Sequence, residues 1–337
     1  MSAGPAKNTV YGRVIVRTEE DTAVPGSLGI VIMGLGEAGR SHLSALESVP
    51  GASVTGIVDI RAIEVPSFRG HEVPCAASPA ELAQMIEPPD VLSVVTPSGS
   101  HPQDAALAAS AFPRARLLIE KPLSTTPDGL LLLRALDADS PGRVRSLLHA
   151  SFSPEVAWAH AVVAAHASQW GPIAKADQCF ADAYRDDAAG HSARLGSSWL
   201  DSGANALSVL GRFVALEGLL QATAVSPLTS HVTLRCRNSA GEALEVPVLT
   251  SWDVHQPAKV THLTLSCGVE MFIDHSAVTG RALRAGRVLE WFTGPTGVQR
   301  REMHYEALYR ALVAGEEVLT GAMEWKIADI VVAATGL

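Results

Sequence analysis

Three glycines in one short segment have the spacing that holds a phosphate group. Gly34, Gly36 and Gly39 form the pattern G-x-G-x-x-G directly after the apolar run 28–33. A buried strand that turns into a helix at such a loop presents free backbone N–H groups at the helix start, and these bind a pyrophosphate. The first glycine permits the tight turn, the second lets the phosphates approach, and the third lets the helix pack on the strand. The pattern therefore indicates a dinucleotide site.

A carboxylate at the end of the next apolar run fits the same site. The run 54–58 leads to Asp59, about 20 residues after the last glycine, where an acidic side chain binds the hydroxyls of the adenosine ribose. Asp59 favours NAD because it would repel a 2′-phosphate. Arg61 keeps NADP open, since its guanidinium could pair with that phosphate. We expect NAD or NADP, with NAD favoured.

Two later loops should border the nicotinamide, because ligands of a doubly wound sheet bind beyond the carboxyl ends of its strands. The apolar run 91–95 is followed by Thr96, Pro97 and His101, and the run 117–119 is followed by Glu120 and Lys121. Lys121 could donate a hydrogen bond to a substrate oxygen. Partial burial would lower its pKa toward a range useful for acid–base chemistry.

A third group of polar residues lies in the second half of the chain. Asp201 and Asn205 are four residues apart, so they project from one face if a helix begins here. The helix dipole would then keep Asp201 ionised. The alternative interpretation is that Asp201 only caps the helix.

The elements that position these residues fall into two groups. From residue 28 to about 150, short apolar runs alternate with helical stretches, which predicts a Rossmann-like, doubly wound parallel sheet with helices on both faces. After residue 150, alternating segments without intervening helices predict an α+β domain with an open, mainly antiparallel sheet. We expect an extension over 1–27 with a strand over 11–16, a nucleotide-binding domain over 28–150 and a substrate domain over 151–337.

The predicted elements have the following ranges. Strands are expected over 28–33, 54–59, 91–95, 115–119, 144–149, 219–225, 231–237, 244–254 and 260–267. Helices are expected over 40–48, 78–86, 102–111, 126–137, 155–167, 201–213, 304–313 and 324–335.

Composition narrows the class of partner. The chain has 337 residues, 47% of them hydrophobic, and a net charge of −9, which is typical of a soluble, mildly acidic protein. Without a basic block or a basic amphipathic helix, we expect a small-molecule substrate and no nucleic-acid or membrane partner. The four cysteines lack C-x-x-C spacing, so no metal site is expected. No segment reads as a signal peptide or membrane span, which favours the cytoplasm, and the open sheet favours a homodimer or homotetramer.

Taken together, these motifs resemble the Gfo/Idh/MocA oxidoreductases, from about Leu28 almost to the C-terminus. The resemblance implies a Rossmann domain followed by an open antiparallel sheet that supplies the substrate site. It predicts catalytic roles for Lys121, Asp201 and Asn205. The expected cofactor-binding residues are Gly34, Leu35, Gly36, Glu37, Ala38, Gly39, Asp59, Arg61, Thr96, Pro97, His101, Glu120 and Lys121.

Within that family, the segment from Asp201 to Ser208 is similar to the dehydrogenases that oxidise the anomeric carbon of D-galactose or L-arabinose to a lactone. Most of the family carries a histidine at the position of Asn205, and an amide cannot replace it as a proton acceptor. Ser202 stands where the sugar dehydrogenases carry proline, and Tyr184 to Asp187 where they carry Trp-His-Pro.

The sequence therefore predicts an NAD(P)-dependent sugar dehydrogenase in which Asp201, coupled to Lys121, accepts the hydroxyl proton and Asn205 orients the sugar. His191, His149 and Trp199 are expected only to line the pocket. Two alternatives remain. One is a reductase of a keto-sugar or an imine, and the other is a sensor that binds NAD(P) and sugar without turnover.

Overall fold

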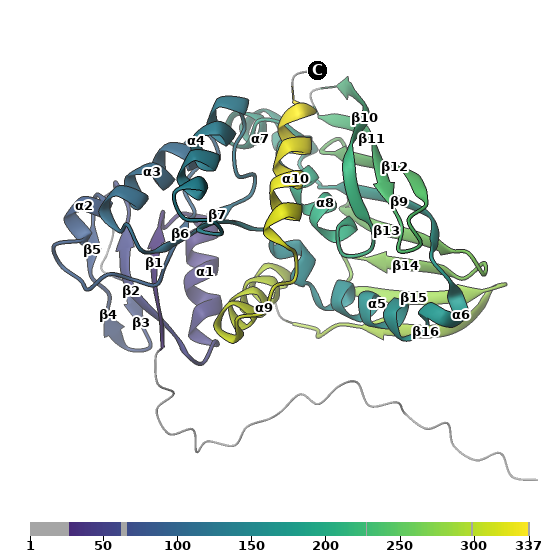
Figure 1. Ribbon diagram of the computed structural model, residues 1–337, viewed down its shortest axis with the longest axis horizontal. Helices are drawn as coiled ribbons and strands as arrows, with labels where there is room; N and C mark the ends of the chain where they lie inside the picture. Colours follow the sequence, from purple (N-terminus) through teal and green to yellow (C-terminus); the bar gives the residue numbers. More distant parts are fainter. Residues whose placement is uncertain (1–26, 62–65, 227, 298, 336–337) are drawn as a thin grey trace, which may run out of the picture.

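The computed structural model describes residues 27–61, 66–226, 228–297 and 299–335. It has two large sheets, one in each half of the chain, with helices α8, α9 and α10 between them (Figure 1). The strand predicted over 11–16 lies outside the described residues.

The first sheet has six parallel strands in the order β5-β2-β1-β6-β7-β8. β1 lies between β2 and β6, so the strand order reverses at β1, and a crevice opens there beyond the carboxyl ends. A separate two-stranded sheet joins β3 and β4. The elements are β1 (Leu28–Met33), α1 (Glu37–Glu47), β2 (Ala52–Val58), β3 (Ser67–Phe68), β4 (His71–Glu72), β5 (Cys75–Ala76), α2 (Pro79–Leu82), β6 (Val91–Val94), α3 (His101–Ala111), β7 (Arg116–Glu120), α4 (Pro127–Ala138) and β8 (Val144–Leu147).

The second sheet has eight strands in the order β10-β11-β12-β9-β13-β14-β15-β16. Its pairings are antiparallel except that between β9 and β12. Its elements are η1 (His149–Phe152), α5 (Pro154–Ala165), α6 (Ala167–Trp170), β9 (Ile173–Ala181), η2 (Arg185–Asp187), α7 (Ala188–Leu195), η3 (Trp199–Gly203), α8 (Ala204–Leu210), β10 (Ala215–Ser226), β11 (Thr229–Arg237), β12 (Ala243–Ser251), β13 (Ala258–Leu265), β14 (Glu270–Asp274), β15 (Thr279–Arg284), β16 (Arg287–Thr293), α9 (Arg300–Ala314) and α10 (Gly321–Ala333).

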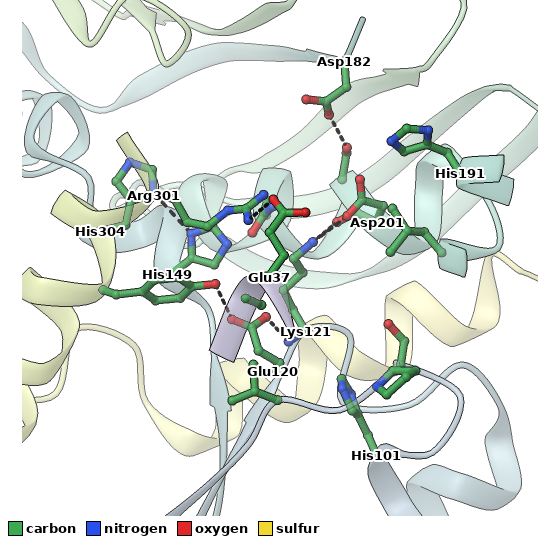
Figure 2. A pocket seen from close by; sticks show the side chains of 18 of the residues that line it. Glu37, His101, Glu120, Lys121, His149, Asp182, His191, Asp201, Arg301 and His304 are labelled. Atoms are coloured by element: carbon green, nitrogen blue, oxygen red, sulfur yellow. Dashed lines mark hydrogen bonds and ion pairs between the residues drawn. The ribbon is translucent and has the colours of Figure 1, made fainter. Parts of the chain in front are cut away.

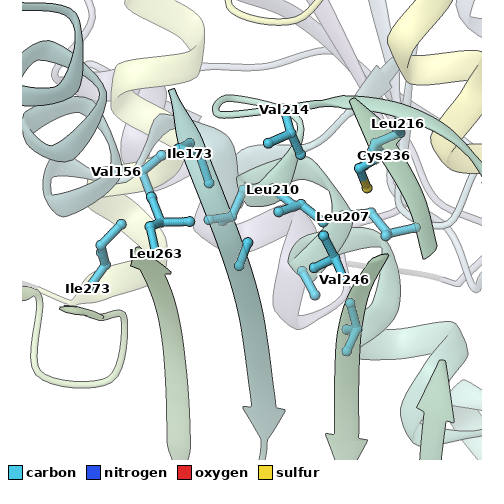
Figure 3. Close-up of a cluster of buried hydrophobic side chains, with 14 of the residues drawn as sticks. Val156, Ile173, Leu207, Leu210, Val214, Leu216, Cys236, Val246, Leu263 and Ile273 are labelled. Carbon is cyan, nitrogen blue, oxygen red and sulfur yellow. The ribbon is translucent and has the colours of Figure 1, made fainter. Parts of the chain in front are cut away.

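One face of the second sheet forms a hydrophobic core with α5, α8 and α10. Leu207 and Leu210 of α8 pack among Val246, Leu263 and other aliphatic side chains of the strands (Figure 3). Burial of these side chains fixes α8 on the sheet, and with it the polar turn that precedes α8.

The last two helices join the domains. Tyr305 and Tyr309 of α9 are buried in the core around α1 and β1, and Ala328 and Val332 of α10 are buried with the helices on the other face of the first sheet. The site between the domains is therefore held by packing as well as by chain connectivity.

The predicted fold class is confirmed, and the main differences are local. The sequence did not predict β9, β14, β15 and β16, the short strands β3, β4 and β5, or the helices α6 and α7. Burial along β9 is irregular and does not alternate strictly, so its sequence gives little period-2 signal. The helix expected over 78–86 has only four residues, and the helix expected from residue 201 begins with a π-helical turn, η3.

Candidate active site

The glycine loop between β1 and α1 has a shape that requires its glycines. Gly34 has φ +99°, a conformation that side-chain-bearing residues rarely adopt. A Cβ on Gly39 would lie 2.0 Å from the carbonyl oxygen of Gly34, whereas a Cβ on Gly36 would meet no described atom within 4 Å. Gly36 thus borders open space at the start of α1, where a pyrophosphate would lie. The loop fits a dinucleotide.

Asp59 lies directly after β2 and is bound to this loop. Its Oδ2 accepts a hydrogen bond of 2.8 Å from the backbone N–H of Leu35. Arg61 donates to both carboxylate oxygens, from Nε to Oδ1 at 2.9 Å and from Nη2 to Oδ2 at 2.7 Å. The hydrogen bond from Arg61 is the main reason that the pKa of Asp59 lies well below its usual range. Asp59 is therefore a carboxylate positioned beside the proposed adenosine site.

A cavity of about 360 Å³ lies beyond the carboxyl ends of β6 and β7, between the two domains. Figure 2 shows charged and polar side chains from both domains pointing into it. Of the predicted residues, those that line it are Glu37, Ala38, Thr96, Pro97, His101, Glu120, Lys121, His149, His191, Asp201 and Asn205. Gly34, Leu35, Gly36, Asp59 and Arg61 belong to the adjoining loops and Gly39 to α1, outside the cavity lining. Trp199 was also predicted to line the cavity, and this is wrong, because its side chain is buried in the core of the second domain.

Lys121 and Asp201 form an ion pair across the domain boundary. Lys121 Nζ donates to Asp201 Oδ1 at 2.6 Å and to the Asp201 backbone oxygen at 2.9 Å (Figure 2). Burial by itself would lower the pKa of Lys121, but Asp201 and Glu120 raise it above its ordinary value. The expected lowering of this pKa is therefore wrong. Burial would raise the pKa of Asp201, but Lys121 holds it below its ordinary value, so both groups are charged.

The base of the cavity is fixed by a buried polar network around Glu120. Glu120 Oε1 accepts hydrogen bonds from Tyr305 Oη at 2.6 Å and from His42 Nε2 at 3.2 Å, and Oε2 accepts from the Lys121 backbone N–H at 2.9 Å. Burial would raise the pKa of Glu120, but His42 and Lys121 hold it below its usual range. The network positions the backbone of Lys121.

His101 connects the two loops that sequence reasoning placed near the nicotinamide. Its ring lies 2.8 Å from the carbonyl oxygens of both Thr96 and Pro122. The side chain therefore holds these loops together besides lining the cavity.

Asn205 contributes to the cavity a buried side-chain oxygen that lacks a hydrogen-bond donor in the described part of the chain. Its Oδ1 is buried and has no hydrogen-bond partner among the described residues. A buried acceptor of this kind is costly unless a ligand or water donates to it. A substrate hydroxyl would supply the missing donor.

Sequence reasoning missed a second buried ion pair in the cavity. Lys259 Nζ lies 2.5 Å from Asp182 Oδ1, and Ser202 Oγ donates to Asp182 Oδ2 at 2.9 Å. Asp182 directly follows β9, which was not predicted. Lys259 is on the buried face of β13, in phase with Thr261 and Leu263, and a lysine at a buried position of an alternating strand was the available signal.

Two further groups from α9 complete the lining. Arg301 Nη1 donates to Glu37 Oε1 at 2.8 Å, which links α9 to the start of α1. His304 lies against His149, with their Nδ1 atoms 3.2 Å apart. His149 follows β8 and lines the cavity, as the sequence predicted.

In the described part of the chain, no three His, Cys, Asp or Glu side chains are grouped so that they could bind a metal ion. None of the described helices combines the length and apolarity needed to cross a bilayer.

Comparison with solved structures gives the same fold. The chain is similar to biliverdin reductase from Synechocystis sp. PCC 6803, with 15% identity, a TM-score of 0.64, and coverage of 92% of this chain and 98% of that one. It is similar to myo-inositol 2-dehydrogenase from Lactobacillus plantarum, with 15% identity, a TM-score of 0.69 and coverage of 92% and 96%. It is also similar to the WlbA dehydrogenase from Thermus thermophilus, solved with NAD and UDP-GlcNAcA, with 17% identity, a TM-score of 0.65 and coverage of 92% and 95%. No curated protein sequence matches the chain.

The glycine loop and the strand order define a Rossmann-like nucleotide-binding fold in the first domain. Residues 28–140, about a third of the chain, match the model of the Gfo/Idh/MocA family, described as an oxidoreductase family with an NAD-binding Rossmann fold.

Proposed function

We propose that this protein oxidises the anomeric carbon of an aldose to a lactone, with NAD(P)⁺ as hydride acceptor. The observation that carries the proposal is the Lys121–Asp201 pair at the carboxyl end of β7. A lysine ammonium has three N–H donors, and Asp201 takes two of them. The third is available to the oxygen of a substrate in the cavity.

The lining supports a polyhydroxylated substrate. Asn205 Oδ1 offers an acceptor without a partner, and Asp182, Lys259 and Arg301 add charged groups that bind hydroxyls. Charged and polar residues together outnumber apolar ones in the lining, and a cavity of about 360 Å³ suits a small ligand.

The residues have distinct roles in the proposed reaction. When bound, the oxidised nicotinamide supplies the site that accepts a hydride. Lys121 donates to the C1 oxygen and stabilises negative charge as its proton leaves. The sequence predicted Asp201 as the proton acceptor, but Lys121 holds its pKa below its ordinary value and makes it a weak base, so its proposed role is instead to hold the Lys121 ammonium in place. Asn205 orients a neighbouring hydroxyl.

NAD is the proposed cofactor. Asp59 is ionised and lies where the adenosine ribose would bind, so it accepts hydrogen bonds from ribose hydroxyls and repels a 2′-phosphate. Arg61 is already paired with this carboxylate, and the pairing weakens the attraction of its guanidinium for a 2′-phosphate.

A second candidate is oxidation of a ring hydroxyl of a cyclic polyol. The solved structure of myo-inositol 2-dehydrogenase shares the fold at a TM-score of 0.69, and the third N–H of Lys121 would serve a secondary hydroxyl equally well.

The test is an assay of NADH and NADPH formation across D-galactose, L-arabinose, D-xylose, D-glucose, D-fucose and myo-inositol. Activity with an aldose supports anomeric oxidation and identifies the cofactor. Activity with myo-inositol alone favours the second candidate. No activity with any of them, while cofactor binding is demonstrated separately, contradicts both and favours the reductase or the sensor.

A further inference from the structure

The proposed reaction lacks a proton acceptor. Lys121 is an ammonium with a raised pKa, Asp201 is held ionised by that ammonium, and the Asn205 amide does not titrate. Oxidation of a hydroxyl requires a base, because the proton must leave as the hydride departs.

His149 has an unused nitrogen in the cavity. Its Nδ1 lies 3.2 Å from His304 Nδ1, and no partner for its Nε2 is found among the described residues. Figure 2 shows the ring between His304 on one side and the region of Lys121 and Glu37 on the other. Burial keeps the pKa of His149 well below 6.5, so the ring is neutral at physiological pH.

The contact between the two histidines restricts their tautomers. Burial lowers the pKa of His304 to about 3, so this ring is neutral as well. Two neutral rings that share a Nδ1–Nδ1 hydrogen bond need one donor and one acceptor. If His304 accepts, its own proton is on Nε2, and His149 has its proton on Nδ1 and a lone pair on Nε2.

Glu155 favours that arrangement. His304 Nε2 is buried without a described partner, and so is Glu155 Oε2. The other oxygen, Oε1, already accepts from Ser153 Oγ at 2.7 Å and lies 2.9 Å from His275 Nδ1. The Glu155 charge raises the pKa of His304 and so favours positive charge on its ring. Because Nδ1 is engaged with His149, Nε2 is the ring nitrogen free to carry the His304 proton.

We propose that His149 is the proton acceptor of the reaction and that His304, backed by Glu155, is a positioning residue that fixes its tautomer. This inference rests on the proposed function. In the balanced step, the substrate C–H bond breaks and its electron pair leaves as hydride to the oxidised nicotinamide. The O–H bond breaks, its proton goes to His149 Nε2, and the carbon–oxygen double bond forms. The imidazolium then releases the proton to solvent through the cavity.

Charges around both rings are compatible with this role. Glu120 stabilises the His149 imidazolium, whereas Lys121, Arg301 and His304 oppose it, so the proton is taken up transiently and lost again. Around His304, Glu155 favours a positive charge and Arg300, Lys259 and His275 oppose it.

The kinetic test uses His149→Asn, which keeps an N–H near the position of Nδ1 and loses Nε2. We expect kcat/KM to fall by about 10²–10⁴ with unchanged cofactor affinity, and the residual rate to increase with hydroxide concentration. In wild-type enzyme, the acid limb of kcat/KM should lie well below pH 6.5. His304→Asn keeps an acceptor oxygen and should retain more activity than His304→Leu. The control is His160→Asn, at a histidine of α5 outside the cavity lining.

A second measurement needs no substrate. In ¹⁵N-labelled protein, NMR should show His149 with a proton on Nδ1 and a bare Nε2 at neutral pH, assigned by loss of its signals in His149→Asn. A proton on Nε2, an imidazolium at neutral pH, or full activity of folded His149→Asn overturns the inference. A wild-type enzyme that oxidises no sugar or polyol refutes the proposed function instead, and the NMR result then decides the tautomer alone.

Discussion

Replacing Lys121 by methionine removes the ammonium while keeping a side chain of similar length. The variant loses the one N–H that Asp201 does not use, and with it the charge that would stabilise the developing alkoxide in the proposed reaction. Loss of one such donor costs about 10²–10³ in kcat, or about 2.7–4 kcal/mol. We expect Lys121→Met to lose activity by this factor, measured as NAD(P)H formation, while still binding the cofactor.

The same change has a separate effect on stability. Without Lys121, the buried Asp201 carboxylate loses its ion-pair partner, and breaking such a pair costs about 3–5 kcal/mol. The double variant Lys121→Met/Asp201→Asn removes both charges and should regain much of the lost thermal stability. It should regain no activity, because the donor is still absent.

These two readouts separate catalysis from folding. A Lys121→Met enzyme within about five-fold of wild-type kcat, or a double variant whose activity recovers along with its stability, would refute the assigned role of Lys121.

Three further predictions follow from the cofactor loop and the buried groups. Gly36→Ala should leave the melting temperature unchanged, because its Cβ meets no described atom within 4 Å, but it should weaken NAD binding measured by calorimetry. Gly39→Ala, whose Cβ would lie 2.0 Å from the Gly34 oxygen, should lower both the melting temperature and the NAD affinity. Equal NAD affinity of Gly36→Ala and wild type would contradict the pyrophosphate site. Asp59→Ser should raise the ratio of NADP to NAD activity, because the repelling carboxylate is gone and Arg61 is released; an unchanged ratio would count against ribose recognition by Asp59. His304 has a folded-state pKa of about 3, lowered from 6.5, so its contribution to the free energy of unfolding is complete above pH 6.5 and is lost as pH falls toward 3. Linkage predicts that the free energy of unfolding falls by about 2 kcal/mol by about pH 5. Chemical denaturation of His304→Asn should show a smaller decrease over the same pH range.

The sequence predicted the site residues that directly follow strongly apolar strands. Gly34, Asp59 and Lys121 are local signals, because each stands at a fixed position relative to a buried parallel strand. They meet at the carboxyl-end edge of the sheet, as the topology of a doubly wound fold requires.

The remainder of the site depends on tertiary contacts that no local pattern encodes. Lys121 and Asp201 are far apart in sequence. The Asp201 carboxylate reverses the lowering of the Lys121 pKa that burial alone would give. The alternation of β13 places Lys259 on the buried face, but only the tertiary structure shows that Asp182 is its partner. His304 becomes informative only when α9 packs on the first domain and brings it to His149.

Anomeric oxidation is tested most directly by isotope transfer. An aldose found active in the panel would be labelled with deuterium at C1 and incubated with the enzyme and oxidised cofactor. We predict one deuterium at C4 of the reduced nicotinamide, a lactone product and slower turnover than with unlabelled sugar. Reduced cofactor without deuterium would show that the hydride comes from another carbon, and would contradict oxidation at the anomeric position.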